Sequence, residues 1–333
     1  MAELGVALLT FASARTQDFI DLGRCAEEQG YAACYTTESL TDTLAIDLAI
    51  VLRTSRIRVG SFVAISYLRH PVIVAQMAVT ASDLSGGRFV LGLGLGHKVR
   101  VEALGRTVGK PTTDLPAYVR DVKAVLEGRG RERYPDLPIQ IYQGEVLDFK
   151  TSEHPVPVYA AAVGPRMAAA GAAVSDGLMV WLVPQAGIGE LTAAAARAGE
   201  QSGRRNAPPV EVAVHTFVTD DIAAARESAR ASLGYWLGLP AYNGALARAG
   251  YEREAASIAE AFRAGDQTGL RAAITDRLVD EYCLVGPPGR CRDQLEKWHD
   301  TDVATVALVP HPVMPQENYA EGVRRSLKAL SPA

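Results

Sequence analysis

RHPVIVAQMAVTASDLSGGRFVLGLGLG, residues 69–96, contains a complete helix–turn–strand unit. Pro71 is tolerated in a first helical turn, and the apolar run from Val72 to Leu84 has helical spacing. Ser85-Gly86-Gly87 then ends the helix. Arg88 to Leu95 shows no polar alternation, which is typical of a parallel strand covered on both faces. Glycines at the carboxyl end of such a strand indicate that the backbone closely approaches another group.

The three glycines Gly92, Gly94 and Gly96 first suggest a dinucleotide-binding fingerprint. That fingerprint needs Gly-x-Gly-x-x-Gly directly before a helix. Here the third glycine comes one position early, and His97 stands in its place. Asp114 lies at a suitable distance for a ribose contact, but the glycine spacing argues against this interpretation. Two alternatives are left: the glycines let a barrel strand pack tightly, or they leave room beside a cofactor.

Composition indicates an ordinary globular chain: 333 residues, 48% hydrophobic and 22% charged. A net charge of -4 gives no reason to expect a nucleic acid as partner. The first residues, MAELGVALLT, favour a first strand over a signal peptide, and no apolar run is long enough for a membrane span. The 4 cysteines lack CxxC spacing, so we expect reduced, mostly buried thiols in a cytoplasmic protein, with no metal site.

Strand and helix signals alternate along nearly the whole chain. The pattern predicts an α/β fold, a single (β/α)8 TIM-barrel domain over residues 1–333, with insertions at about 95–155 and 221–280. Within the insertions we expect a surface hairpin at 138–150, several helices from 221 to 280, and a helix at 114–127 with Asp114 as its N-cap. A short extended piece is expected at 281–285. The eight barrel strands are predicted at residues 4–9, 32–37, 57–65, 88–95, 156–162, 178–183, 210–219 and 303–309.

In such a barrel the reactive groups lie at the carboxyl ends of the strands. Gly164, Pro165 and Arg166 join the fifth strand to a helix, directly after Val163. A Gly-Pro helix start leaves backbone N–H groups free at the positive end of the helix dipole, which favours a phosphate. Arg166 could add charge-assisted hydrogen bonds. The alternative is a simple helix cap with a solvated arginine.

Two further residues are catalytic candidates. Glu38 follows the second strand and could act as an acid, a base or a substrate clamp, or it could cap the following loop. His97 follows the glycine strand and could contact a ring or donate a proton, or it could be a structural histidine. Trp181 and Trp236 could line a pocket, although aromatic core residues are the more common case.

Taken together, these segments resemble the luciferase-like flavin and deazaflavin oxidoreductase superfamily. The resemblance covers almost all of the chain, and the order and spacing of the motifs carry it. The matching pieces are Ile57-Arg58-Val59-Gly60, Tyr67-x-Arg69-His70-Pro71, Asp83-Leu84-Ser85-Gly86-Gly87-Arg88-Phe89, Leu91-Gly92-Leu93-Gly94, Val158 to Arg166, Ser175-Asp176-Gly177 and Leu284-Val285-Gly286-Pro287-Pro288.

The resemblance implies a TIM barrel that holds FMN or the deazaflavin coenzyme F420. It implies a bulge after the third strand, often with a non-prolyl cis peptide, which presses on one face of the cofactor ring. Here the bulge would comprise Phe62, Val63, Ala64 and Ile65. The cofactor site would further include Gly94 and Gly96, with the phosphate at Val163, Gly164, Pro165 and Arg166. The short chain and the LGLGLGHK segment resemble the F420 branch.

Two departures from the family pattern concern the chemistry. Ile65-Ser66 stands where relatives often have Asn-Pro, and Ser39 follows Glu38 where a histidine is common. The second departure argues against a sugar-phosphate dehydrogenase that uses that histidine. The function implied is hydride transfer between reduced F420 and a small organic substrate, with C=C or C=N reduction in specialised metabolism by a homodimer. The alternatives are an FMN-dependent monooxygenase and a cofactor-free barrel that acts as a binding protein.

Overall fold

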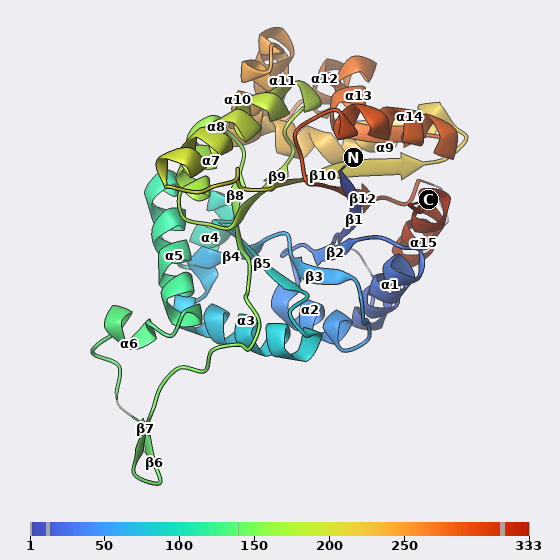
Figure 1. Cartoon of the computed structure of the whole chain (residues 1–333). Coiled ribbons are helices and arrows are strands. Elements are labelled where there is room, and N and C mark those ends of the chain that lie inside the picture. The colour runs from blue at the N-terminus through green and yellow to red at the C-terminus, as the bar shows by residue number, and fades with distance from the viewer. Residues whose placement is uncertain (1, 11–13, 139, 314–316, 333) are drawn as a thin grey trace.

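Eight parallel strands form a closed ring in the computed structural model, which describes residues 2–10, 14–138, 140–313 and 317–332 (Figure 1). Each strand pairs with the next around the ring, and pairing of β9 with β10 closes it. The predicted (β/α)8 TIM barrel is therefore confirmed. In ring order the strands are β1 (Glu3–Leu8), β2 (Ala33–Thr36), β3 (Arg58–Ser61), β5 (Phe89–Gly94), β8 (Val158–Ala162), β9 (Gly177–Trp181), β10 (Val210–Val218) and β12 (Thr305–Pro310).

The strands are largely apolar because the barrel interior and the outer helices both cover them. Every residue of β5 is buried, and so is every residue of the longer β10. This is the burial that the unbroken apolar run after Gly87 predicts. β11 (Cys283–Gly286) is not a member of the ring, because it pairs with the last residues of β10 at the edge of the sheet.

Helices surround the ring, as Figure 1 shows. α3 (Pro71–Ser85) begins at N-cap His70 with Pro71 in its first turn, and it ends at Gly86 in the left-handed conformation with φ 64°. This confirms the helix–turn–strand unit of the sequence. The other barrel helices are α1 (Thr16–Glu28), α2 (Thr43–Val51), α5 (Pro111–Leu126), α7 (Pro165–Ala172), α8 (Ile188–Gln201), α14 (Pro288–His299) and α15 (Tyr319–Ala329).

Two expectations were wrong in detail. Asp114 does not cap α5, because the helix starts earlier, with Lys110 as N-cap and Pro111 at its first position. Asp114 instead accepts a 2.5 Å hydrogen bond from the Tyr67 hydroxyl. The third strand is not continuous over 57–65: β3 ends at Ser61, and a separate β4 (Ala64–Ile65) pairs with β5.

The first insertion carries a hairpin that stands away from the barrel (Figure 1). Its strands β6 (Gln140–Tyr142) and β7 (Glu145–Leu147) are antiparallel and fully exposed, as expected for a surface hairpin. The same insertion contains the short helices α4 (Lys98–Ala103) and α6 (Gly130–Arg133).

The second insertion is helical, as predicted, and packs over β10 and β11 with a hydrophobic cluster of its own that includes Phe217 and Leu233. Its helices are α9 (Ile222–Gly238), α10 (Pro240–Arg248), α11 (Glu252–Ala264), α12 (Gln267–Ala273) and α13 (Asp276–Tyr282). Two 3-10 turns, η1 (Ser66–Leu68) and η2 (Gln185–Gly187), complete the structure.

The expected burial of the thiols is confirmed, since the four cysteines are buried; none of them is in a disulfide. None of the helices within the described residues is long and apolar enough to cross a membrane. The described residues also contain no cluster of three or more His, Cys, Asp or Glu side chains that could hold a metal ion.

Candidate active site

A bulge interrupts the barrel between β3 and β4, at the carboxyl end of the third strand. The peptide bond between Phe62 and Val63 is cis, so the bulge and the non-prolyl cis peptide implied by the resemblance are both present. Phe62 is buried and lies 5.7 Å from the Tyr35 ring, centroid to centroid. The Ser61 hydroxyl donates a 2.8 Å hydrogen bond to the Gly92 carbonyl and so links β3 to the glycine strand.

Glycines at the end of β5 and just after it leave room for this bulge. A Cβ on Gly94 would lie 2.4 Å from Val63 Cγ2 and 3.2 Å from the Ala161 Cβ of β8. A Cβ on Gly96, which has φ +78°, would lie 2.7 Å from Ile65 Cγ2. The close approach indicated by the sequence is therefore real, and the group that approaches is the bulge. Direct contact of Gly94 and Gly96 with a cofactor remains a prediction.

Glu38 is held in a buried ion pair beneath the bulge. Its Oε2 accepts a 2.6 Å hydrogen bond from the Ile65 backbone N–H and another of 2.6 Å from Arg69 Nη1. Only 5% of the Glu38 side chain is exposed, and Arg69 also contacts Asp42 at 2.9 Å. The carboxylate thus joins the end of β2 to the bulge and to the start of α3. An acid, base or substrate role for Glu38 remains a prediction.

His97 lies on an aromatic wall at the carboxyl end of β5. It is the N-cap residue of α4, and its half-buried ring lies 4.8 Å from the Trp236 ring and 6.0 Å from the Tyr242 ring, both of the helical insertion. Burial, with a smaller contribution from nearby Arg100, lowers the pKa of His97. The imidazole is therefore neutral at physiological pH and can donate or accept one hydrogen bond at each nitrogen.

The start of α7 combines free backbone donors with an arginine that the sequence did not indicate. Gly164 is the N-cap residue, and no side chain caps the helix. Arg248, the last residue of α10, donates a 3.3 Å hydrogen bond to the Val163 carbonyl. A Cβ on Gly164 would lie 2.8 Å from Arg248 Nη2, so the glycine makes room for the guanidinium. Arg166 is exposed nearby. The combination suits an anion.

Three further aromatic side chains come together: Trp181 at the end of β9, His215 within β10 and His311 directly after β12. Trp181 Nε1 donates a 3.1 Å hydrogen bond to His215 Nε2, and His215 Nδ1 lies 2.7 Å from His311 Nε2. Trp181 is also 5.7 Å from Trp236, so this group continues the aromatic wall that carries His97. The sequence marked Trp181 and the strand ends, but it gave no signal that His215 and His311 form a pair.

The amino-acid sequence matches a known family. A model of the luciferase-like monooxygenase family matches residues 3–305. The chain belongs to this family. The family resemblance predicted from the sequence is therefore confirmed, over most of the chain.

Curated relatives within the family carry names that refer to F420 or to a related reductase. The 5,10-methylenetetrahydromethanopterin reductase of Methanolobus tindarius is 26% identical, covering 89% of this chain and 91% of that protein. A putative coenzyme F420-dependent oxidoreductase of Mycobacterium tuberculosis is 27% identical, covering 92% of this chain and 94% of that protein.

Solved structures share the fold over the full length. The coenzyme F420-dependent tetrahydromethanopterin reductase from Methanopyrus kandleri has a TM-score of 0.77 at 19% identity, covering 99% of this chain and 97% of that one. An oxygenating monooxygenase component from Pseudomonas putida, solved with FMN, has a TM-score of 0.64 at 16% identity, covering 99% of this chain and 97% of that one. At these identities the likeness extends to the fold alone.

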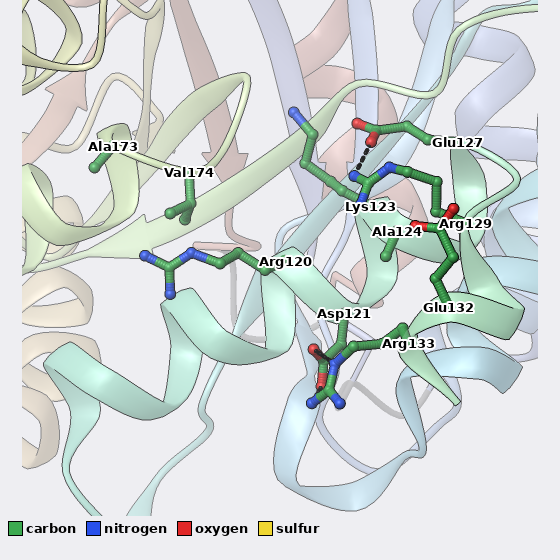
Figure 2. Close-up of a pocket in the computed structure, with 10 residues that line it drawn as sticks. All are labelled: Arg120, Asp121, Lys123, Ala124, Glu127, Arg129, Glu132, Arg133, Ala173 and Val174. Atoms are coloured by element: carbon green, nitrogen blue, oxygen red, sulfur yellow. Dashed lines mark hydrogen bonds and ion pairs between the residues drawn. The ribbon is translucent and has the colours of Figure 1, made fainter. Parts of the chain in front are cut away.

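A separate surface pocket of about 570 Å³ lies between α5, α6 and the end of α7 (Figure 2). Its charged side chains largely neutralise one another: Asp121 pairs with Arg133 and Glu127 with Arg129, as Figure 2 shows. It is lined by the carboxyl-terminal halves of helices, which in a barrel of this family lie at the amino ends of the strands. The candidate site, around the bulge and the aromatic wall, lies at the opposite end of the barrel.

Proposed function

We propose that this protein is an F420-dependent oxidoreductase that transfers a hydride between the reduced deazaflavin and a small organic substrate. The observation that carries the proposal is the Phe62–Val63 bulge, which packs on Gly94 at the carboxyl end of the barrel. Gly94 in turn lies against Ala161 of β8. This strand leads to Gly164 at the start of α7, where an anion could bind; we call this start of α7, with Arg248, the anion seat. The name of the Mycobacterium tuberculosis relative supports F420 over FMN.

The residues around the bulge fit a flat ring that carries a phosphate tail. Phe62, Val63, Ala64 and Ile65 would support one ring face, while the free N–H groups of α7 with Arg248 and Arg166 would bind the phosphate. The deazaflavin, when bound, supplies the two-electron hydride chemistry. The protein supplies orientation, because catalysis by hydride transfer requires the donor and acceptor carbons to be held close and aligned.

Glu38 and His97 have different parts in this proposal. Glu38 holds the bulge through Ile65 N–H and thereby fixes the height of the ring support. His97, neutral and on the aromatic wall, would orient the substrate through a hydrogen bond; to protonate the substrate it would first have to take up a proton, which its lowered pKa disfavours. The apolar wall of Trp236 and Trp181 favours a small apolar substrate. In line with the family resemblance, we further propose that the bond reduced is C=C or C=N, in specialised metabolism.

The test is an anaerobic assay of the purified protein with reduced F420 and a panel of cyclic imines and conjugated enones. Substrate-dependent formation of oxidised F420, measured by absorbance, would support the proposal. Product formation only with reduced FMN and oxygen would favour the FMN-dependent monooxygenase over this proposal. The Pseudomonas putida monooxygenase component, solved with FMN, has the same fold. Binding of neither cofactor would favour the cofactor-free barrel that acts as a binding protein.

We also propose a cytoplasmic homodimer. Sedimentation equilibrium should give twice the chain mass of 35.5 kDa. A mass of one chain across the concentration range would contradict the dimer.

A further inference from the structure

Trp181 lies on β9, His215 on β10 and His311 directly after β12, and these three strands are neighbours in the ring. His215 is almost completely buried, at 1% exposure, and His311, directly after β12, is half-buried. The planes of Trp181 and His215 differ by 18° and those of His215 and His311 by 20°. The rings are thus nearly parallel, and their nitrogens point at one another, as two in-line hydrogen bonds require.

The chemistry of the three rings gives these hydrogen bonds a direction. An indole Nε1–H can only donate, so His215 Nε2 accepts and carries no proton. A neutral imidazole has one N–H, which in His215 is therefore at Nδ1 and donates to His311 Nε2. His311 Nε2 is then an acceptor as well. In the neutral His311 ring the proton must be at Nδ1.

The surroundings keep both imidazoles neutral. Burial, with a smaller contribution from His311, lowers the pKa of His215 well below its usual value. Burial lowers the pKa of His311 to about 4. There is also a direct reason: a proton added to His311 Nε2 would face the Nδ1–H of His215 and break the 2.7 Å contact. No Lys, Arg, Asp or Glu side chain in the described residues forms a hydrogen bond or ion pair with either ring.

The Nδ1–H of His311 is the free end of the hydrogen-bonded series Trp181–His215–His311. Within the described part of the chain it has no hydrogen-bond partner, while the ring itself is fixed by face-to-face packing on Phe217, at 4.5 Å and 12°. It lies at the carboxyl end of β12, the end of the barrel where the bulge and His97 also lie. The structure therefore presents one oriented, uncharged donor at the candidate active site.

We propose that His311 binds the substrate through this Nδ1–H, which donates a hydrogen bond to a carbonyl oxygen of the substrate, and that Trp181 and His215 are positioning residues that fix the tautomer. This rests on the proposed function, since it assumes that substrate binds at the carboxyl end of the barrel. It narrows the substrate class to small, largely apolar molecules with a carbonyl acceptor beside the reacting bond. An enone or a carbonyl-conjugated imine meets that description. Because His311 is neutral, its role is to hold and polarise the oxygen, with no net proton transfer from the ring.

The first test reads the tautomers directly. The chain has 6 histidines, so long-range ¹H–¹⁵N correlation spectra of labelled protein are tractable, with His215→Gln and His311→Gln for assignment. We expect both rings to be protonated at Nδ1 alone at pH 7. Trp181→Phe keeps a ring but removes the donor, so His215 should then populate both tautomers. An Nε2–H form of either ring in the wild type, or a Trp181→Phe spectrum identical to wild type, would overturn the proposal.

The second test uses acetophenone as a carbonyl probe and toluene as a probe of similar shape without the oxygen. Acetophenone should shift the His311 Nδ1 resonance in a saturable way, and toluene should leave it unchanged. Equal shifts with both probes, or no shift with acetophenone, would contradict substrate binding by His311. The tautomer spectra and the probe-induced shift of His311 Nδ1 are both measured without F420. A protein that fails to bind F420 would therefore contradict the proposed function but would leave these two results unchanged.

A kinetic comparison completes the test once an enone or imine substrate is found. His311→Phe preserves the packing on Phe217 but removes the N–H, and should lower kcat/KM about tenfold, as expected for one neutral hydrogen bond. The dissociation constant of F420 should stay within twofold of wild type. Unchanged kcat/KM in His311→Phe, or an equal loss for a substrate without a carbonyl oxygen, would overturn the proposal.

Discussion

Replacing Glu38 with glutamine should destabilise the protein, because Glu38 is a structural anchor of the bulge. The Glu38 side chain is 5% exposed and Arg69 is 14% exposed, so both charges are largely removed from water. Breaking such a pair by removing one partner costs about 3–5 kcal/mol. Arg69 keeps its 2.9 Å contact with exposed Asp42, which recovers about 1 kcal/mol at most. Glutamine can still accept from the Ile65 N–H. We therefore expect a loss of about 2–3 kcal/mol.

Urea unfolding of Glu38→Gln, Arg69→Met and the double variant measures this directly. Because the two residues share one interaction, the double variant should be less destabilised than the sum of the single variants, by about 2 kcal/mol. The matched control is Glu28→Gln, which breaks the exposed 3.6 Å pair with Arg24 and should change stability by less than about 0.5 kcal/mol. Additive effects, or a Glu38→Gln variant as stable as the Glu28→Gln control, would refute the anchoring role.

Three other predictions concern the bulge, the histidine pair and the anion seat. Gly94→Ala would bring a Cβ to 2.4 Å from Val63 Cγ2, so the free energy of unfolding measured in urea should fall by about 1–3 kcal/mol. The double variant Gly94→Ala/Val63→Ala should recover part of this loss. A double variant less stable than Gly94→Ala alone would count against the contact. The pKa of His311 is lowered to about 4 in the folded protein, from 6.5 in the unfolded chain. Between these two pH values the unfolded chain binds more protons than the folded protein, so the free energy of unfolding should fall as the pH drops. Between pH 8 and pH 5 this loss should be about 2 kcal/mol and should be absent in His311→Phe; parallel pH curves for the two proteins would contradict it. Arg248→Gln should weaken cofactor binding about tenfold in calorimetry and reduce the salt dependence of binding. Arg253→Gln, the same charge change at an exposed residue of α11, should have no effect; equal losses in both variants would point to net charge alone.

The alternation of strands and helices could be predicted from local sequence signals, and the structure confirms it. The apolar run of β5 is buried on both faces, and Pro71 and Gly86 bound α3 as their backbone preferences require. The start of a helix was predicted wrongly where two signals competed: α5 begins at Pro111, and Asp114 lies within its first turn. The position of the bulge came from family resemblance, since nothing local in Phe62-Val63 indicates a break in an otherwise apolar strand.

The side-chain partnerships at the site could not be read from the sequence. Arg248 reaches the Val163 carbonyl across 85 residues, from a helix in the second insertion. His215 and His311 are 96 residues apart, and each alone has a simple explanation, one as a core histidine and one as the residue before a proline. The pairing of β10 with β12 in the sheet brings the two imidazoles together. The same holds for Glu38, whose carboxylate meets a backbone N–H of the bulge.

The central claim is that the carboxyl end of this barrel binds F420. The most direct measurement is isothermal titration calorimetry of the purified apoprotein with F420 and, separately, with FMN, with the Arg248→Gln variant in parallel. We predict one saturable site for F420 per chain, much weaker FMN binding, and a reduced F420 affinity in the variant. Tight binding of FMN with no heat from F420 would contradict the account.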